Sequence, residues 1–208
     1  MKLPVLNIKG EKTGREVTLD KSVFGIAEHN HAVYLAIKQY RANNRQGTSK
    51  AKERGEIKGS TRKIKKQKGT GTARAGSIKN PLFKGGGRVF GPKPREYNSK
   101  LNKKVKLLAR LSALSDKANS KNILILEDFN FDKPKTKDYI NVLTSLGVDK
   151  DKTMLVLSDI NKSVVLSSRN VQTTNVVSIH EMNVYNILDA TKLIIVESAL
   201  KNITINNN

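Results

Sequence analysis

Apolar side chains recur at regular spacing towards both ends of the chain, and this pattern is lost in the middle. Val33, Ile37 and Tyr40 follow at helical spacing after Asn30, a favourable N-cap residue, and predict a helix to about residue 42. The stretch before this helix alternates loosely between apolar and polar residues. Short strands that pair as a hairpin are therefore predicted at residues 3–9 and 16–19, with turns at Gly10 and Gly14.

Helical spacing returns after Asn98, where Leu101, Val105 and Leu108 lie on one stripe and predict a helix to about Asn119. Beyond it, short apolar runs alternate with helical patterns. This order is typical of α/β proteins, so we predict a mostly parallel sheet flanked by helices. The predicted strands are 122–127, 153–159, 175–179 and 192–196, and the predicted helices are 135–146, which ends at Gly147, 162–168, 182–190 and 197–203.

The middle of the chain, from Asn43 to about Tyr97, contains ten glycines, three prolines and no sustained periodicity. From Arg45 to Asn80 the large apolar residues are three isoleucines, and no aromatic ring is present. Such a segment buries too little to offset the entropy of ordering, so it is predicted to be a long loop. We predict a globular body formed by residues 1–43 and 97–208, with the extended loop 44–96 inserted between two helices.

Positive charge is concentrated in the same region. The segment from Arg41 to Arg110 holds 22 of the 39 Lys and Arg residues and three of the 18 acidic residues, a formal charge of +19. Phosphates would neutralise this self-repulsion, and released counterions would supply entropy. Because the run is internal and interleaved with small residues, nucleic-acid contact is favoured over a solvated loop. The missing aromatics favour structured RNA over single strands, although charge alone fits RNA or DNA.

Several classes of function are disfavoured by composition. Cysteine is absent, which removes disulfides and thiolate metal sites and is compatible with the cytoplasm. No apolar run approaches the roughly 18 residues of a membrane span, and the first residues do not resemble a signal peptide. We therefore expect a cytoplasmic protein with no membrane partner.

Nucleotide and metal sites are also disfavoured. The glycines at 69 and 71 and at 85–87 lie in the loop rather than between a strand and a helix, and none precedes a Lys-Ser/Thr pair. His29 and His31 would diverge by about 200° on a helix, and His180 stands apart from them in sequence. We expect no cofactor and no metal.

Four carboxylates follow the predicted strands, where α/β enzymes place their chemistry: Glu127, Asp128, Asp159 and Glu197. Their positions also suit the starts of helices, where negative charge is favourable. No convincing set of nucleophile, base and orienting residue accompanies them. We therefore expect a protein that is not an enzyme, and a nucleic-acid-modifying enzyme that uses Asp128 and Asp159 remains the alternative.

The loop carries a long ordered string of motifs. Arg45-Gln46-Gly47-Thr48, the run from Gln67 to Pro81, and the run from Gly85 to Pro92 closely resemble the bacterial large-subunit ribosomal protein L-four family. Asn102-Lys103-Lys104 and the run from Lys133 to Lys137 are similar to the same family. The resemblance covers most of the chain.

This resemblance implies a structural component of the large ribosomal subunit, a primary rRNA-binding protein in the cytoplasm. The loop would enter the RNA core and help line the peptide exit tunnel. Partners would be large-subunit ribosomal RNA, neighbouring ribosomal proteins near the tunnel and, in passing, the nascent peptide. The implied rRNA-binding residues are Arg45, Gln46, Lys50, Lys52, Arg54, Lys58, Arg62, Lys63, Lys65, Lys66, Lys68, Arg74, Lys79, Lys84, Arg88, Lys103 and Lys104. The implied tunnel-lining tip comprises Lys63, Lys66, Gln67, Lys68, Gly69, Thr70, Gly71 and Arg74.

The chain departs from the family pattern at two places. Thr72 stands where members often have Arg, which removes one guanidinium, and Ile64-Lys65 stands where they often have Pro-Trp. Tip shape and contacts with macrolide-class drugs are therefore not carried over. A free RNA- or DNA-associated regulator is the alternative binding role.

Overall fold

The computed structural model describes residues 1–205, and within them six strands form one sheet in the order β2-β1-β3-β6-β4-β5. β1 and β2 are antiparallel, and every other neighbouring pair is parallel. The prediction of an α/β fold with a mostly parallel sheet is confirmed. The strands are β1 (Lys2–Leu6), β2 (Lys12–Thr18), β3 (Ile123–Leu126), β4 (Thr153–Leu157), β5 (Thr174–Ser178) and β6 (Lys192–Val196).

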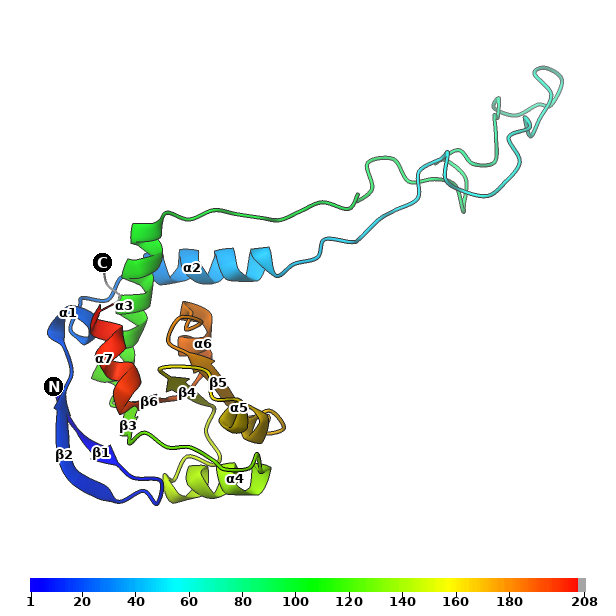
Figure 1. Ribbon diagram of the computed structural model, residues 1–208. Coiled ribbons are helices and arrows are strands. Elements are labelled where there is room, and N and C mark those ends of the chain that lie inside the picture. Colours follow the sequence, from blue (N-terminus) through cyan, green and yellow to red (C-terminus); the bar gives the residue numbers. More distant parts are fainter. Residues whose placement is uncertain (206–208) are drawn as a thin grey trace. The chain divides into compact units, whose positions relative to one another are not determined.

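Five of the helices pack in two groups: α3 contacts both α1 and α6, and α4 contacts α5. Figure 1 shows the strands β3, β6 and β4 between α3 on one side and α4 on the other. No helix within residues 1–205 is long and apolar enough to cross a membrane. The helices are α1 (Lys21–Phe24), α2 (Asn30–Asn43), α3 (Lys103–Asn119), α4 (Thr136–Ser145), α5 (Lys162–Ser168), α6 (Val184–Asp189) and α7 (Glu197–Ile205).

Most predicted elements are present with bounds shifted by a few residues, and α5 and β6 match the predicted ranges at both ends. The short helix α1 was not predicted, because four residues are too few to show helical periodicity. Asp20 caps it by accepting a hydrogen bond from the Ser22 amide. Asn30 is the first residue of α2 rather than its cap.

The chain divides into two compact units, residues 1–41 with 100–208, and residues 42–99. The hydrophobic core lies in the first unit. All five residues of β4 are buried, and so are four of the five in β6, because helices cover both faces of these central strands. Their continuous apolar runs follow from this two-sided burial.

The turn between β1 and β2 makes a close contact with the end of α4. Gly10 has φ +81°, and a Cβ there would lie 2.2 Å from the carbonyl oxygen of Ser145. Gly14 has φ +76° with open space around it, and it lies in an irregular stretch of β2 between residues paired with Pro4 and Leu6. The prediction of a turn at Gly14 was wrong, since this glycine serves a bulge within the strand.

The two glycines give a matched pair of variants. Gly10→Ala and Gly14→Ala both impose a left-handed conformation on alanine, but only the first also drives a methyl group into backbone. We expect Gly10→Ala to lower the free energy of unfolding by about 1–3 kcal/mol more than Gly14→Ala does. Urea unfolding of the two variants measures this difference, and equal midpoints would contradict it.

Candidate nucleic-acid interface

Residues 44–99, all described by the structure, form neither helix nor strand, and Figure 1 draws them from cyan to green. They run out and back as two legs joined by four single backbone hydrogen bonds. The paired residues move steadily closer in sequence, so the legs are in antiparallel register without forming a ladder. The pairs are Gly47 with Arg95, Ala51 with Pro92, Lys52 with Arg88 and Ile64 with Gly76, at 3.0–3.1 Å.

This unit carries a strong positive charge. Residues 42–99 contain 16 basic and three acidic residues, and residues 57–95 contain no acidic residue at all. Of the sequence-predicted rRNA-binding residues, all are exposed except Lys79, which is half-buried. Fifteen of the 17 lie in this unit, and the other two lie in α3. The arrangement presents a cationic surface to solvent.

Two of the three carboxylates form ion pairs near residues 50–56, one across the legs and one within a leg. Glu53 pairs with Lys93 across the legs at 2.5 Å, and Glu56 pairs with Lys50 at 2.6 Å. The Lys50 hydrogen bond lowers the pKa of Glu56, and the hydrogen bond to Glu53 raises the pKa of Lys93. The Lys50 ammonium, predicted to bind RNA, is therefore already engaged by a carboxylate.

Glycine allows the legs to pack closely at the same place. Gly87 is buried, and a Cβ there would lie 2.3 Å from the backbone nitrogen of Arg54. Next to it, the Arg88 amide donates to the Lys52 carbonyl at 3.0 Å. The ion pairs and this contact together form a small ordered node within a segment that has no hydrophobic core.

At the base of the unit two guanidinium groups contact one aromatic ring. Arg45 lies 4.1 Å and Arg95 4.7 Å from the ring centroid of Tyr97. A hydrogen bond from Arg95 has the largest effect and lowers the pKa of Tyr97. Desolvation opposes it, and the charges of Arg45 and Arg95 each lower the pKa to a smaller extent. Gly47, with φ +64°, admits the Arg95 carbonyl to a position 2.0 Å from where a Cβ would stand.

The turn of the unit lies beyond the bond from Ile64 to Gly76. Gly69 and Gly71 have φ +80° and +62°, and a Cβ at either would meet nothing within 4 Å. These two glycines therefore supply left-handed backbone conformations to the turn with no side chain at either position. Of the predicted tip residues, Lys66, Gln67, Lys68, Gly69, Thr70, Gly71 and Arg74 lie within residues 65–75, and Lys63 lies just before them and bonds to Gln67.

Two predicted residues belong to the other unit. Lys103 and Lys104 are exposed in the first turn of α3, which contains no acidic residue. Asn102 precedes the helix but makes no side-chain capping bond. Two cations at the positive end of a helix dipole are unfavourable without an anion nearby. Their placement is what a phosphate-binding helix start would need.

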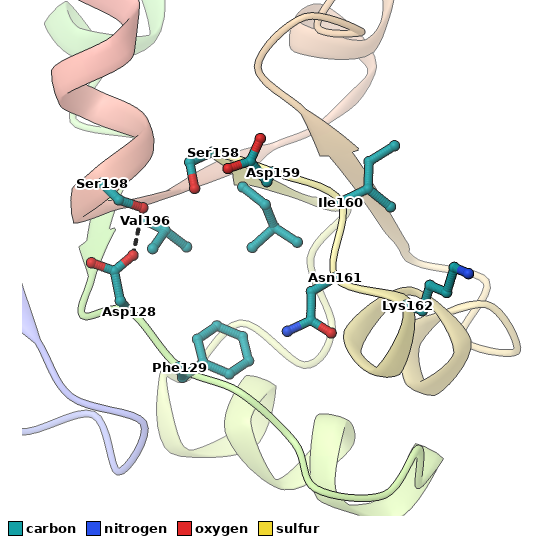
Figure 2. Close-up of a pocket in the computed structure, with 10 residues that line it drawn as sticks. Asp128, Phe129, Ser158, Asp159, Ile160, Asn161, Lys162, Val196 and Ser198 are labelled. Carbon is teal, nitrogen blue, oxygen red and sulfur yellow. Dashed lines mark hydrogen bonds between the residues drawn. The ribbon is translucent and has the colours of Figure 1, made fainter.

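The strand-end carboxylates lie where the sequence placed them, but three of the four are held by structural partners. Arg15 contacts both Glu127, at 2.7 Å, and Glu197, at 3.2 Å. Asp128 accepts a hydrogen bond from Ser198 at 2.5 Å, as Figure 2 shows. These bonds tie the ends of β3 and β6 to the β1–β2 hairpin and to α7.

Asp128 and Asp159 do line a shared hollow of about 420 Å³ after β3, β4 and β6. Figure 2 shows its labelled lining, which includes serine, asparagine and lysine but no histidine that could act as a base. Within the described part of the chain, no three His, Cys, Asp or Glu residues gather as metal ligands. The hollow lacks an assembled catalytic set.

Sequence reasoning missed three contributors to the cationic unit. Arg95 and Tyr97 were not singled out, because Tyr97 joins the legs through its contact with Arg45, about 50 residues earlier in the chain. The tethering role of Glu53 was missed for the same reason. An aromatic residue at the end of a basic loop was the one available signal for Tyr97.

Comparison with known proteins gives a consistent result. The model of the Ribosomal protein L4/L1 family matches residues 17–205, which include the whole of the cationic unit. The large ribosomal subunit protein uL4 of Christiangramia forsetii is 61% identical over 203 residues, 98% of each chain. That of Flavobacterium psychrophilum is 61% identical over 98% of this chain and 97% of its own. That of Amoebophilus asiaticus is 56% identical over 208 residues, 100% of this chain and 99% of its own.

The tyrosine at the base gives a test of the stacked arrangement. Subtracting the ultraviolet alkaline titration of Tyr97→Phe from that of the parent isolates the Tyr97 phenol. Its pKa is expected below the usual value near 10, and Arg95→Gln should raise it, since a hydrogen bond and a charge are lost. Tyr139 serves as the contrast, because burial raises its pKa to about 12. A Tyr97 curve that Arg95→Gln leaves unmoved would contradict the arrangement.

Proposed function

Because the chain belongs to the Ribosomal protein L4/L1 family, we propose that it is a structural component of the large ribosomal subunit and a primary rRNA-binding protein. Residues 44–96 are the segment that enters the RNA core, and residues 1–43 and 97–208 form the body that anchors it. The observation that carries this proposal is a segment with 12 basic residues and no acidic one between residues 57 and 95. A polyanion is the partner that such a segment needs.

Ribosomal RNA meets that need in two ways. Its phosphates neutralise closely spaced cations that have no carboxylate partner, such as Arg62, Lys66 and Arg74 among the described residues. Each phosphate contact also releases condensed counterions, so affinity depends steeply on salt. The glycines let the backbone approach the RNA closely, since a residue without a side chain leaves room for a phosphate or a sugar.

The turn at residues 65–75 is the part that helps line the peptide exit tunnel in this proposal. Two of its residues are glycines with positive φ and no side chain, which lets the backbone there lie close to a narrow channel. Its charged residues are all cations: Lys65, Lys66, Lys68 and Arg74. The nascent peptide would pass this turn, and neighbouring ribosomal proteins near the tunnel would contact the rest of the protein.

The body has an anchoring role and no catalytic one in this proposal. Lys103 and Lys104, at the start of α3, give the body phosphate-binding cations of its own. Three of the carboxylates that an enzyme would require are held by Arg15 and Ser198. No cofactor and no metal is needed for RNA binding of this kind, and the place of action is the ribosome in the cytoplasm.

Charge reversal at the turn tests the role of the cations. The variant Lys66→Glu, Lys68→Glu, Arg74→Glu is expected to bind large-subunit rRNA at least about tenfold more weakly, because three phosphate contacts are lost, and to enter large subunits poorly. The matched control changes Lys9, Lys12 and Lys150, three exposed lysines of the body, to Glu and alters the net charge by the same amount. Filter binding and subunit reconstitution measure both. Equal loss in the control would refute a specific role of the turn.

Replacement of the whole segment separates an integral component from a peripheral one. Residues 45–95 are exchanged for a short Gly/Ser linker, and both proteins are sedimented with large subunits at moderate and then high salt. The intact protein should remain with subunits at high salt, and the shortened one should be lost. Early release of the intact protein would instead favour a free RNA-associated regulator.

A further inference from the structure

The cationic unit contains an apolar hollow that phosphate binding does not explain. A space of about 660 Å³ lies beside Ile64 and Ile78, with Arg62, Lys63, Lys65 and Lys66 around it. The two isoleucines are 45% and 51% exposed. They are two of the three large apolar residues between positions 45 and 80.

Bonds between the legs hold together the residues that line the hollow. The Ile64 amide donates to the Gly76 carbonyl at 3.0 Å, and the Ser77 hydroxyl donates to the Ser60 carbonyl at 2.8 Å. These bonds bring Ile64 from one leg beside Ile78 from the other. The apolar surface is therefore a feature of the paired legs and not of either leg alone.

The rim of the hollow is cationic. In the described part of the chain, Arg62, Lys63, Lys65 and Lys66 form no ion pair with a carboxylate. Lys65 bonds to Thr72 at 2.7 Å, so its ammonium is oriented without being neutralised. A ligand that satisfies the whole hollow must combine a flat apolar face with negative charge close by.

A nucleotide has this combination, whereas a phosphate alone would leave both isoleucines in water. We propose that the hollow binds one unpaired base of an RNA, with the base against Ile64 and Ile78 and its flanking phosphates on Arg62 and Lys66. This inference rests on the proposed RNA-binding function and adds a base contact to it. Unpaired bases in bulges and loops are the parts of RNA whose faces are free for such contact.

The first test compares two RNA hairpins that differ by one base. One carries a single-nucleotide bulge, and the other has an abasic ribose at the bulge, so both have the same phosphates. The parent protein should prefer the complete bulge by about fivefold or more, since covering apolar surface is favourable. Ile64→Ala and Ile78→Ala should each abolish most of this preference. Their binding should keep the parent's salt dependence, because no charge is changed.

Ile160→Ala is the matched control, since Ile160 is 59% exposed in the body and lies far from the cationic unit in sequence. It should bind both hairpins as the parent does. Equal binding of the two hairpins by the parent would overturn the base contact and leave the charge-based function standing. If the parent protein bound neither hairpin, RNA binding itself would be refuted.

The second test uses assembled large subunits. A benzophenone amino acid in place of Ile78 is expected to cross-link to the base of a single RNA nucleotide on irradiation. The same amino acid in place of Ile160 should not cross-link to that nucleotide. Cross-links from position 78 that reach only protein, or are spread over many nucleotides, would overturn the proposal.

Discussion

The unbalanced charge of residues 42–99 is the constraint on which the rest of the structure depends. Sixteen basic residues share a segment with no hydrophobic core, so neither burial nor charge pairing can hold it in one shape. Its few stabilising contacts are concentrated at defined places. Glu53 and Glu56 form the ion pairs of the node, and Tyr97 contacts two guanidinium groups at the base. The turn has no carboxylate and remains open to a partner.

The body is stabilised in the opposite way. Its parallel strands are buried on both faces, and its ionic contacts serve the fold, as Arg15 does between Glu127 and Glu197. Lys117 is buried and donates to the Ala190 carbonyl at 2.7 Å, which gives its ammonium a hydrogen-bond partner inside the body. A stable sheet covered by helices is a suitable support for a segment that cannot fold by burial.

Much of the candidate interface was predictable because charge and glycine content are local properties of a sequence. Lys66, Lys68 and Arg74 were identified from composition, motif and family resemblance, and the structure exposes all three. What could not be predicted is which cations are already engaged. Lys50 was included with the RNA-binding residues, yet Glu56 holds it at 2.6 Å. The apolar hollow was missed because Ile64 and Ile78 become neighbours only when the legs pair.

By itself the sequence determined the α/β class, the order of its elements and the position of the basic segment. These follow from periodicity, from breakers such as Gly147 at the end of α4, and from residue charge, all of which act over a few neighbouring positions. Only the tertiary structure decided that Gly14 lies in a bulge, that Gly10 meets Ser145, and that Arg45 meets Tyr97. Each of these depends on pairing or packing with residues distant in the chain, whose approach is governed by strand register and tertiary contacts rather than by local preference.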